Sequence, residues 1–151
     1  MEDNLVKKDC IELLANNYVG HLAYIENNIP FILPITYYYD PKENAVFSYS
    51  GEGHKIDAMR INKNVSLQVE NIQGINNWKS VLVLGSFNEL QGSAAKMYLH
   101  KFTQGVKSLL AKNEITDAQF INDFSNKLNS GSASIVYRIK INDIIGKYNK
   151  R

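Results

Sequence analysis

Residues 47–62, which read FSYSGEGHKIDAMRIN, combine glycines with an imidazole and an ammonium group. The pattern predicts a short strand, a glycine turn and a helix that begins near His54. Gly51 and Gly53 would let the backbone approach a ligand and adopt positive φ. A helix start presents unpaired N–H groups and a partial positive charge, which favour an anion. With His54 and Lys55 in its first turn, this helix is a candidate phosphate site.

A simpler interpretation of the same stretch stays open. Gly-x-Gly between a strand and a helix is often only a turn, and a His-Lys pair is often solvated surface. The pattern is too short for a dinucleotide fingerprint, and it lacks the Gly-Lys-Ser/Thr of a P-loop. The hydroxyl groups of Ser48 and Ser50 add hydrogen-bond donors near the turn. The residues alone therefore leave a turn and a phosphate site as alternatives.

The composition is that of an ordinary globular domain. The chain has 151 residues, of which 44% are hydrophobic and 21% charged, and its formal net charge is +2. This length favours one domain over residues 1–151. Acidic and basic residues are interspersed, so no basic face indicates a nucleic-acid partner.

The cysteine and histidine content argues against a metal centre. Cys10 is the single cysteine, so no internal disulfide is expected, and the thiol is predicted to pack as a small apolar group. His21, His54 and His100 do not have metal-ligand spacing. The first ten residues resemble neither a signal peptide nor an anchor, and no apolar run approaches the roughly 18 residues of a membrane span. A cytoplasmic location is expected.

Hydrophobic periodicity predicts strands joined by hairpins and flanked by helices. The expected strands are residues 18–26, 29–40, 45–49, 65–71, 78–90 and 133–142. The expected helices are residues 6–16, a helix that begins near His54, residues 93–112 and residues 117–128. Residues 72–77 are expected to form a polar loop, and residues 148–151 a frayed tail. About six strands in hairpin order predict a small antiparallel barrel with helices.

Several positions refine this barrel. Pro34 cannot donate to a strand ladder, so its strand should lie at an edge or contain a bulge. The apolar run 81–84 suggests burial on both faces, and Gly85 suggests a bend at a barrel corner. In the helix after the glycine turn, Ile56, Met59 and Ile61 are expected to face inward. Its cations Arg60 and Lys63 are expected to be solvated near its end.

Three stretches in this order resemble a known family. They are YVGHLAYIENNIPFILPITYYYD, FSYSGEGHK with IDAMRINKNV, and WKSVLVLGSFNEL. They contain a Gly-His-Leu-Ala strand, a Pro-x-x-x-Pro-Ile strand and a Gly-His-Lys helix start. The set is similar to the FMN-binding split barrels related to pyridoxamine 5′-phosphate oxidase, nearest the branch of the Nim-type nitroimidazole reductases. The match covers roughly residues 18–90.

The resemblance implies a mainly β (α+β) fold, a six-stranded antiparallel split β-barrel with flanking helices. It also implies a homodimer with FMN in clefts between the subunits. The main chain of Leu33, Pro34, Ile35 and Thr36 would run along the isoalloxazine. Phe47 and Ser48 would line the ribityl chain, and His54 and Lys55 would hold the phosphate. Trp78 and Ser80 would approach the ring or the ribityl chain.

The implied activity is flavin-dependent reduction of a small organic substrate, nitroaromatic compounds included, with NADH or NADPH as donor. The chemistry would be that of the flavin, and His54 is a candidate proton shuttle if it does not bind phosphate. Vitamin B6 oxidation is not expected, because the second strand lacks arginine and lysine and the tail lacks tryptophan.

Other classes stay open beside the reductase. A flavin-storage or sensor protein would bind FMN without turnover, and the lack of substrate-binding charges favours it. A haem-binding split barrel would need His21 or His100 as an iron ligand. An oligonucleotide-binding barrel would need a basic stripe and exposed aromatic residues that the sequence lacks.

Overall fold

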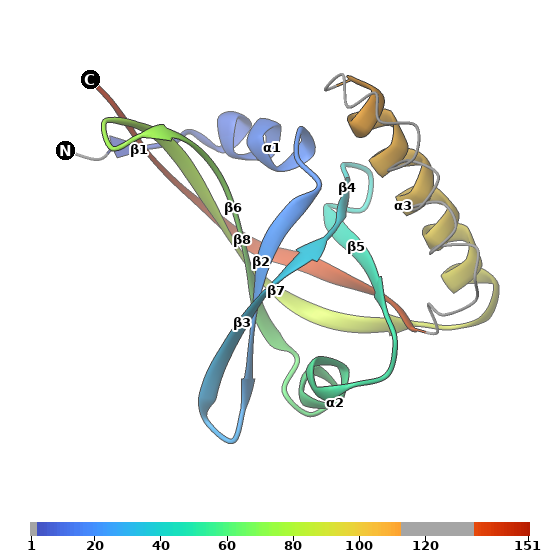
Figure 1. The fold of residues 1–151 in the computed structure, drawn as a ribbon. Coiled ribbons are helices and arrows are strands. Elements are labelled where there is room, and N and C mark those ends of the chain that lie inside the picture. The colour runs from blue at the N-terminus through green and yellow to red at the C-terminus, as the bar shows by residue number, and fades with distance from the viewer. Residues whose placement is uncertain (1–2, 113–134) are drawn as a thin grey trace.

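The computed structural model describes residues 3–112 and 135–151. They form one antiparallel eight-stranded sheet in the order β3-β2-β6-β7-β8-β5-β4, with β1 added beside β8 (Figure 1). The strands are β1 (Asp3–Asn4), β2 (Val19–Glu26), β3 (Ile29–Thr36), β4 (Tyr38–Asp40), β5 (Ala45–Ser50), β6 (Asn64–Gly74), β7 (Asn77–Leu90) and β8 (Ile135–Lys150). The described helices are α1 (Lys7–Ala15), α2 (His54–Ile61) and α3 (Gly92–Lys112).

The predicted class, mainly β with flanking helices, is confirmed, whereas the strand count differs. The predicted strand 29–40 divides into β3 and β4 at Tyr37, whose N–H donates to Tyr18 O at 2.8 Å. The short β1 is the second addition. The predicted helix 117–128 lies outside the described residues.

Two segments predicted to be irregular are strands. The loop predicted at residues 72–77 is confirmed only at residues 75–76, which form the turn, because β6 and β7 continue on either side and Ile72 pairs with Trp78. The frayed tail predicted at residues 148–151 is also wrong, because β8 continues and Tyr148 pairs with Lys79. Pairing with neighbouring strands gives these polar segments backbone hydrogen bonds that their side-chain pattern does not reveal.

Alternate residues of the central strands form the main core. Leu22, Leu67, Val83 and Ile139 are fully buried there, as the strand period of two requires. The run 81–84 follows the same alternation: Val81 and Val83 are buried, whereas the even-numbered residues are half-buried on the opposite face.

Helix α2 closes one end of the barrel with Ile56 and Met59, which are both fully buried. The prediction that Ile61 also faces inward is wrong, since its side chain is 87% exposed. Ile61 follows Ile56 by five residues, so its side chain is rotated by about 140° around the helix axis relative to Ile56 and lies on the solvent side.

Helix α1 packs through Cys10, Leu13 and Leu14, as predicted, whereas Val6 is the exposed N-cap. Burial raises the pKa of the Cys10 thiol, which keeps it protonated and unreactive. The buried Tyr37 hydroxyl donates to Leu14 O at 2.6 Å and so satisfies a carbonyl in the last turn of α1. No helix in the described ranges is both long and apolar enough to cross a membrane.

Pro34 and Gly85 behave as predicted. β3 is the terminal strand of the sheet, and its register runs without a break through the pair Pro34 and His21. Pro34 therefore marks an edge strand and not a bulge. The register of β7 against β8 shifts between Leu84 and Gly85, which bends the pair.

We expect Gly85→Ala to destabilise the fold. A Cβ atom there would lie 2.5 Å from Ile139 Cγ2 and 2.5 Å from Lys140 O, so the β8 backbone would have to move. Overpacking of this kind lowers the free energy of unfolding by about 1–3 kcal/mol. Urea denaturation measures the change. Gly74→Ala is the control, because a Cβ there has no neighbour within 4 Å. Equal stabilities for the two variants would contradict this role of Gly85.

Candidate functional site

The glycine turn leads into α2, but its glycines do not have the predicted positive φ. Gly53 is the N-cap with φ 168° and ψ −172°, which is extended backbone. The prediction that Gly51 and Gly53 adopt positive φ is wrong, since Gly92 alone among the described glycines lies in the left-handed region. No side chain in the described part of the chain caps the start of α2. Its first N–H groups are therefore available to an anion.

His54, the first residue of α2, is already held by the β2–β3 hairpin. Its Nδ1 lies 2.8 Å from the Tyr24 hydroxyl, and its Nε2 contacts the Glu26 carboxylate. The edge of the imidazole packs against the Phe31 ring, with 4.8 Å between centroids, and Phe31 stacks on Tyr24. A neutral imidazole with its proton on Nε2 satisfies both contacts, donating to Glu26 and accepting from Tyr24.

Burial, and then the charge of Glu26, raise the pKa of Tyr24, so the Tyr24 hydroxyl stays protonated and can donate to His54.

Tyr24 and Glu26 were not predicted from the sequence as members of the site. The signal that could have found them is the hairpin itself: Asn27 and Asn28 have φ 51° and 63°, as a two-residue type I′ turn requires. The strand period of two then places Tyr24 and Glu26 on one face near the turn.

Lys55 differs from the other charged residues near the start of α2. It is half-buried, and no residue in the described part of the chain forms an ion pair or hydrogen bond with its ammonium group. Burial lowers its pKa. A half-buried cation without a counter-ion is what a site for a negatively charged ligand requires.

Arg60 is structural and not a solvated charge, so that prediction is wrong. Its Nε donates to Glu89 on β7 at 2.7 Å, and its Nη1 donates to Glu52 in the glycine turn at 3.0 Å. These hydrogen bonds raise the pKa of Arg60, and the bond from Arg60 lowers the pKa of Glu89. Arg60 thus joins the turn before α2 to the long strand β7.

The β3 residues predicted to contact a flavin ring lie on the edge strand, where part of the main chain is unpaired. Leu33 and Ile35 direct their side chains to the core, whereas Pro34 and Thr36 belong to the opposite face. The Thr36 carbonyl accepts a hydrogen bond from Ser48 Oγ at 2.6 Å and is already used.

Phe47 and Ser48 are buried within the chain. The Phe47 ring stacks on Tyr98 of α3 with 4.2 Å between centroids. Both residues pair with β8, and Phe47 also pairs with Tyr38 of β4. Their predicted place along a ribityl chain stays a prediction.

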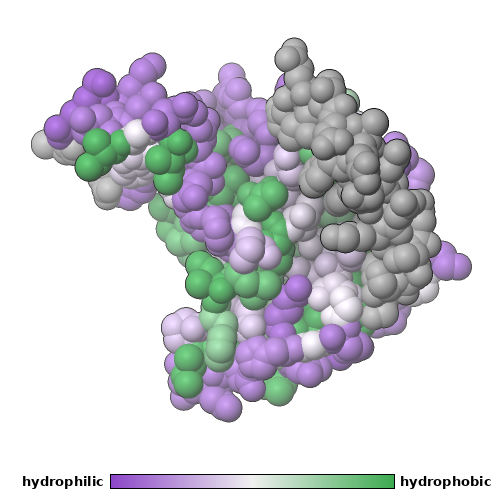
Figure 2. Space-filling view, in the orientation of Figure 1, coloured by the Kyte–Doolittle hydropathy of each residue, from purple (hydrophilic) through white to green (hydrophobic). Residues whose placement is uncertain are grey.

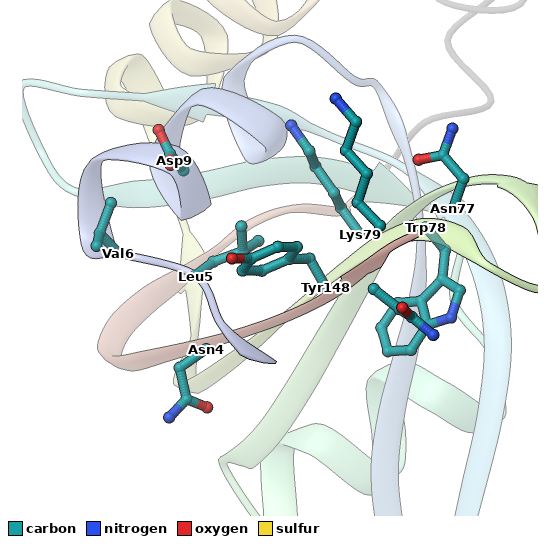
Figure 3. Close-up of a pocket in the computed structure, with 10 residues that line it drawn as sticks. Asn4, Leu5, Val6, Asp9, Asn77, Trp78, Lys79 and Tyr148 are labelled. Atoms are coloured by element: carbon teal, nitrogen blue, oxygen red, sulfur yellow. The ribbon is translucent and has the colours of Figure 1, made fainter. Parts of the chain in front are cut away.

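Trp78 and Ser80 lie on one face of β7. Trp78 lines a cavity of about 290 Å³ between the start of α1 and the paired ends of β7 and β8. The Trp78 indole and the Lys79 side chain point in different directions there (Figure 3). Ser80 Oγ accepts from Gln68 Nε2 at 2.9 Å, and Gln68 Oε1 lies 3.2 Å from His21 Nδ1. This polar group was not predicted.

A second cavity, of about 430 Å³, lies over β2, β6 and β7 and has a largely apolar lining. Ile25 and Pro30 from the hairpin and Leu84 from β7 are among its lining residues. Tyr24 also lines it and reaches His54 through its hydroxyl, so this cavity and the start of α2 share a residue. Its volume lies in the range of small-molecule sites.

The structure therefore brings only part of the predicted set together. His54 and Lys55 lie at the end of the barrel closed by α2, whereas Trp78 lies beside the far hairpin of β6 and β7 (Figure 1). One chain cannot bring these two ends to one small ligand. Among the described residues, no three His, Cys, Asp or Glu side chains gather as a metal site.

The sequence pattern of the pyridoxamine 5′-phosphate oxidase family matches residues 7–147. The chain belongs to this family. The predicted family is confirmed, and the match extends well beyond the stretch 18–90 that carried the resemblance.

Relatives agree with this assignment. An uncharacterized protein of Rhizobium meliloti is 28% identical over 141 residues, which are 93% of this chain and 91% of the relative. The crystal structure of an FAD-binding protein from Mesorhizobium loti is 27% identical, covers 99% of both chains and has a TM-score of 0.76. A protein named for resistance to 5-nitroimidazole antibiotics, from Bacteroides thetaiotaomicron, is 13% identical with a TM-score of 0.66 over 98% of this chain and 87% of that one. The last likeness shows the split-barrel fold alone.

We expect Lys55→Met to stabilise the ligand-free protein at neutral pH. Because burial lowers the pKa of Lys55 below its ordinary value of 10.5, the unfolded state binds the proton more tightly than the folded state. The cost to folding is present at neutral pH and disappears as the pH rises from the folded to the unfolded pKa. An apolar side chain removes this cost and should raise the free energy of unfolding by about 0.5–2 kcal/mol.

Urea denaturation at neutral pH measures this change. Lys8→Met, on the exposed face of α1, is the control and should change stability by less than about 0.5 kcal/mol. A loss of stability in Lys55→Met would show that the ammonium group serves the fold and not a ligand.

Proposed function

We propose that this protein is a cytoplasmic flavin-nucleotide-binding dimer that holds FMN and passes electrons from NADH or NADPH to a small organic substrate, nitroaromatic compounds included. The observation that carries the proposal is the uncapped start of α2 beside Lys55, for which the described residues supply no counter-ion, in a chain of the pyridoxamine 5′-phosphate oxidase family. A terminal phosphate supplies the negative charge and the acceptor oxygens that these groups need.

The chain's own residues fit a flavin nucleotide at several points. Lys55 and the first N–H groups of α2 would hold the phosphate, and the exposed main chain of β3 would hydrogen-bond the ring edge. The apolar cavity over β2, β6 and β7 would exclude water from the ring. The flavin supplies the redox chemistry when it is bound. Both ring nitrogens of His54 are already hydrogen-bonded, so its role as a proton shuttle stays a prediction outside this proposal.

FMN and FAD are both flavin nucleotides, and the similar Mesorhizobium loti protein is described as FAD-binding. We favour FMN, because a single half-buried ammonium group at a helix start matches one terminal phosphate. Titration with both nucleotides decides between them. Tighter binding of FAD would change the cofactor and leave the flavin-binding class intact.

A homodimer is supported by the face of the sheet opposite the barrel core. Val19, Ile25, Ile32 and Ile145 lie on this face of β2, β3 and β8 and expose between 36% and 67% of their surface. The described part of the chain therefore leaves these four side chains uncovered. Apolar side chains gather along the hollow between the β2–β3 hairpin and the β6–β7 hairpin (Figure 2). A second copy would bury this face and could bring Trp78 of one chain toward the α2 end of the other.

A flavin-storage or sensor protein is the second candidate. It is favoured by β3, where the edge strand carries no charged side chain that could bind a charged substrate. Vitamin B6 oxidation is not proposed for the same reason, together with the absence of tryptophan from residues 135–151. Haem binding has little support, because His21 on β2 is hydrogen-bonded to Gln68 and His100 lies on α3.

We expect Lys55→Ala to weaken FMN binding by at least about tenfold, because one charge-assisted hydrogen bond to phosphate is worth about 1.5–3 kcal/mol. Quenching of flavin fluorescence in an equilibrium titration gives the dissociation constant. Lys8→Ala is the control and should bind FMN as the wild type does. Unchanged affinity in Lys55→Ala would refute the phosphate assignment, and wild-type protein that binds neither FMN nor FAD would refute the proposed function.

Anaerobic mixing with NADH or NADPH distinguishes the enzyme from the storage protein. An oxidoreductase should bleach the flavin absorbance of the loaded protein with saturable dependence on donor concentration. Flavin that stays oxidised with both donors, or that is reduced no faster than the same flavin free in solution, would contradict the reductase and favour storage or sensing.

A further inference from the structure

A carboxylate of the β2–β3 hairpin already contacts the first residue of α2. Glu26 pairs with His54 Nε2, and the Tyr24 hydroxyl holds the other side of the imidazole. The imidazole remains accessible, since the side chain of His54 is 51% exposed, whereas the contacting oxygen of Glu26 is buried. A ligand can therefore reach the imidazole beside Glu26.

The other acidic side chains near the start of α2 are neutralised differently. Glu52 and Glu89 are hydrogen-bonded to Arg60, and Asp57 lies 3.7 Å from Arg60 Nη1. These three carboxylates share one guanidinium and do not engage His54. Glu26 is thus the carboxylate bound to a group that a phosphate at this helix start would also contact.

A phosphate and Glu26 cannot share the imidazole without repulsion. A phosphate ester carries nearly two negative charges near neutral pH, and two anions a few ångströms apart repel each other even near a protein surface. A ligand must bring enough negative charge to replace Glu26 at His54. A ligand with the same ring and no phosphate gains nothing from that exchange.

We propose that Glu26 occupies His54 until a terminal phosphate displaces it, and that this exchange makes Glu26 a specificity-determining residue, which lowers the affinity for flavin nucleotides and leaves the affinity for unphosphorylated flavins unchanged. This inference rests on the proposed function, since it concerns the same ligand at the same helix start. It adds that an acidic residue of the β2–β3 hairpin, and not only Lys55, sets the affinity for the phosphate. Tyr24 acts as a positioning residue, because its hydroxyl keeps the imidazole in place during the exchange.

Glu26→Gln tests the exchange with little change in shape. The glutamine carbonyl can still accept from His54 Nε2, so the hairpin contact persists while the competing charge is removed. Affinities for FMN and for riboflavin are measured by fluorescence titration on the full chain. We expect Glu26→Gln to bind FMN at least about fivefold more tightly and riboflavin within about twofold of the wild type.

Asp57→Asn is the matched control. It removes one negative charge from the first turn of the same helix, at a side chain that is 71% exposed and does not contact His54. Its FMN affinity should change by less than about twofold. An equal gain in Asp57→Asn and Glu26→Gln would reduce the effect to general electrostatics and overturn the exchange. Unchanged or weaker FMN binding in Glu26→Gln, or an equal gain for riboflavin, would also overturn it.

Inorganic phosphate separates this inference from the proposed function. If no variant binds any flavin, the proposed function fails, but thermal unfolding with increasing phosphate still tests the exchange. A larger stabilisation by phosphate in Glu26→Gln than in the wild type and in Asp57→Asn supports it. Equal stabilisation in all three proteins, or none, overturns it.

Discussion

The first turn of α2 contains backbone N–H groups that no side chain of the described residues caps, and the proposed function depends on this feature. Polar backbone groups require partners, and at a helix start an anion is a favourable one. The neighbouring charged residues also favour an anion at this helix start. Arg60 is hydrogen-bonded to Glu52 and Glu89, and His54 contacts Glu26, whereas Lys55 has no counter-ion among residues 3–112 and 135–151. The local structure therefore combines unpaired donors with one half-buried cation.

The barrel determines where this helix start lies. Helix α2 is anchored by Ile56 and Met59 in the main core, and Arg60 connects it to Glu89 near the end of β7. The bend at Gly85 turns β7 and β8, so the β6–β7 hairpin extends away from the α2 end. One chain thus holds the two halves of the proposed flavin site at separate ends, and the exposed apolar face between them explains why a second copy belongs to the proposal.

The order of strands and helices could be predicted from the sequence because the apolar residues follow the periods of two and 3.6. The β2–β3 hairpin, the edge position of Pro34 and the bend at Gly85 followed from turn and backbone chemistry. What failed depended on pairing across the sheet. Ile72 and Tyr148 lie in polar segments, and only their partners Trp78 and Lys79 make those segments strands. The phosphate candidates were visible as residue types, whereas the contact of His54 with Glu26 and Tyr24 required the hairpin and the helix to be placed together in space.

The central claim is that the start of α2 holds the phosphate of a flavin nucleotide. A crystal structure of the protein grown with FMN tests it most directly. The account predicts density for the phosphate in hydrogen-bonding contact with the first N–H groups of α2 and with Lys55 Nζ, and a ring that lies between two copies of the chain. A phosphate bound elsewhere, for example beside Lys79, or first N–H groups of α2 that make no contact with the phosphate of bound FMN, would contradict it.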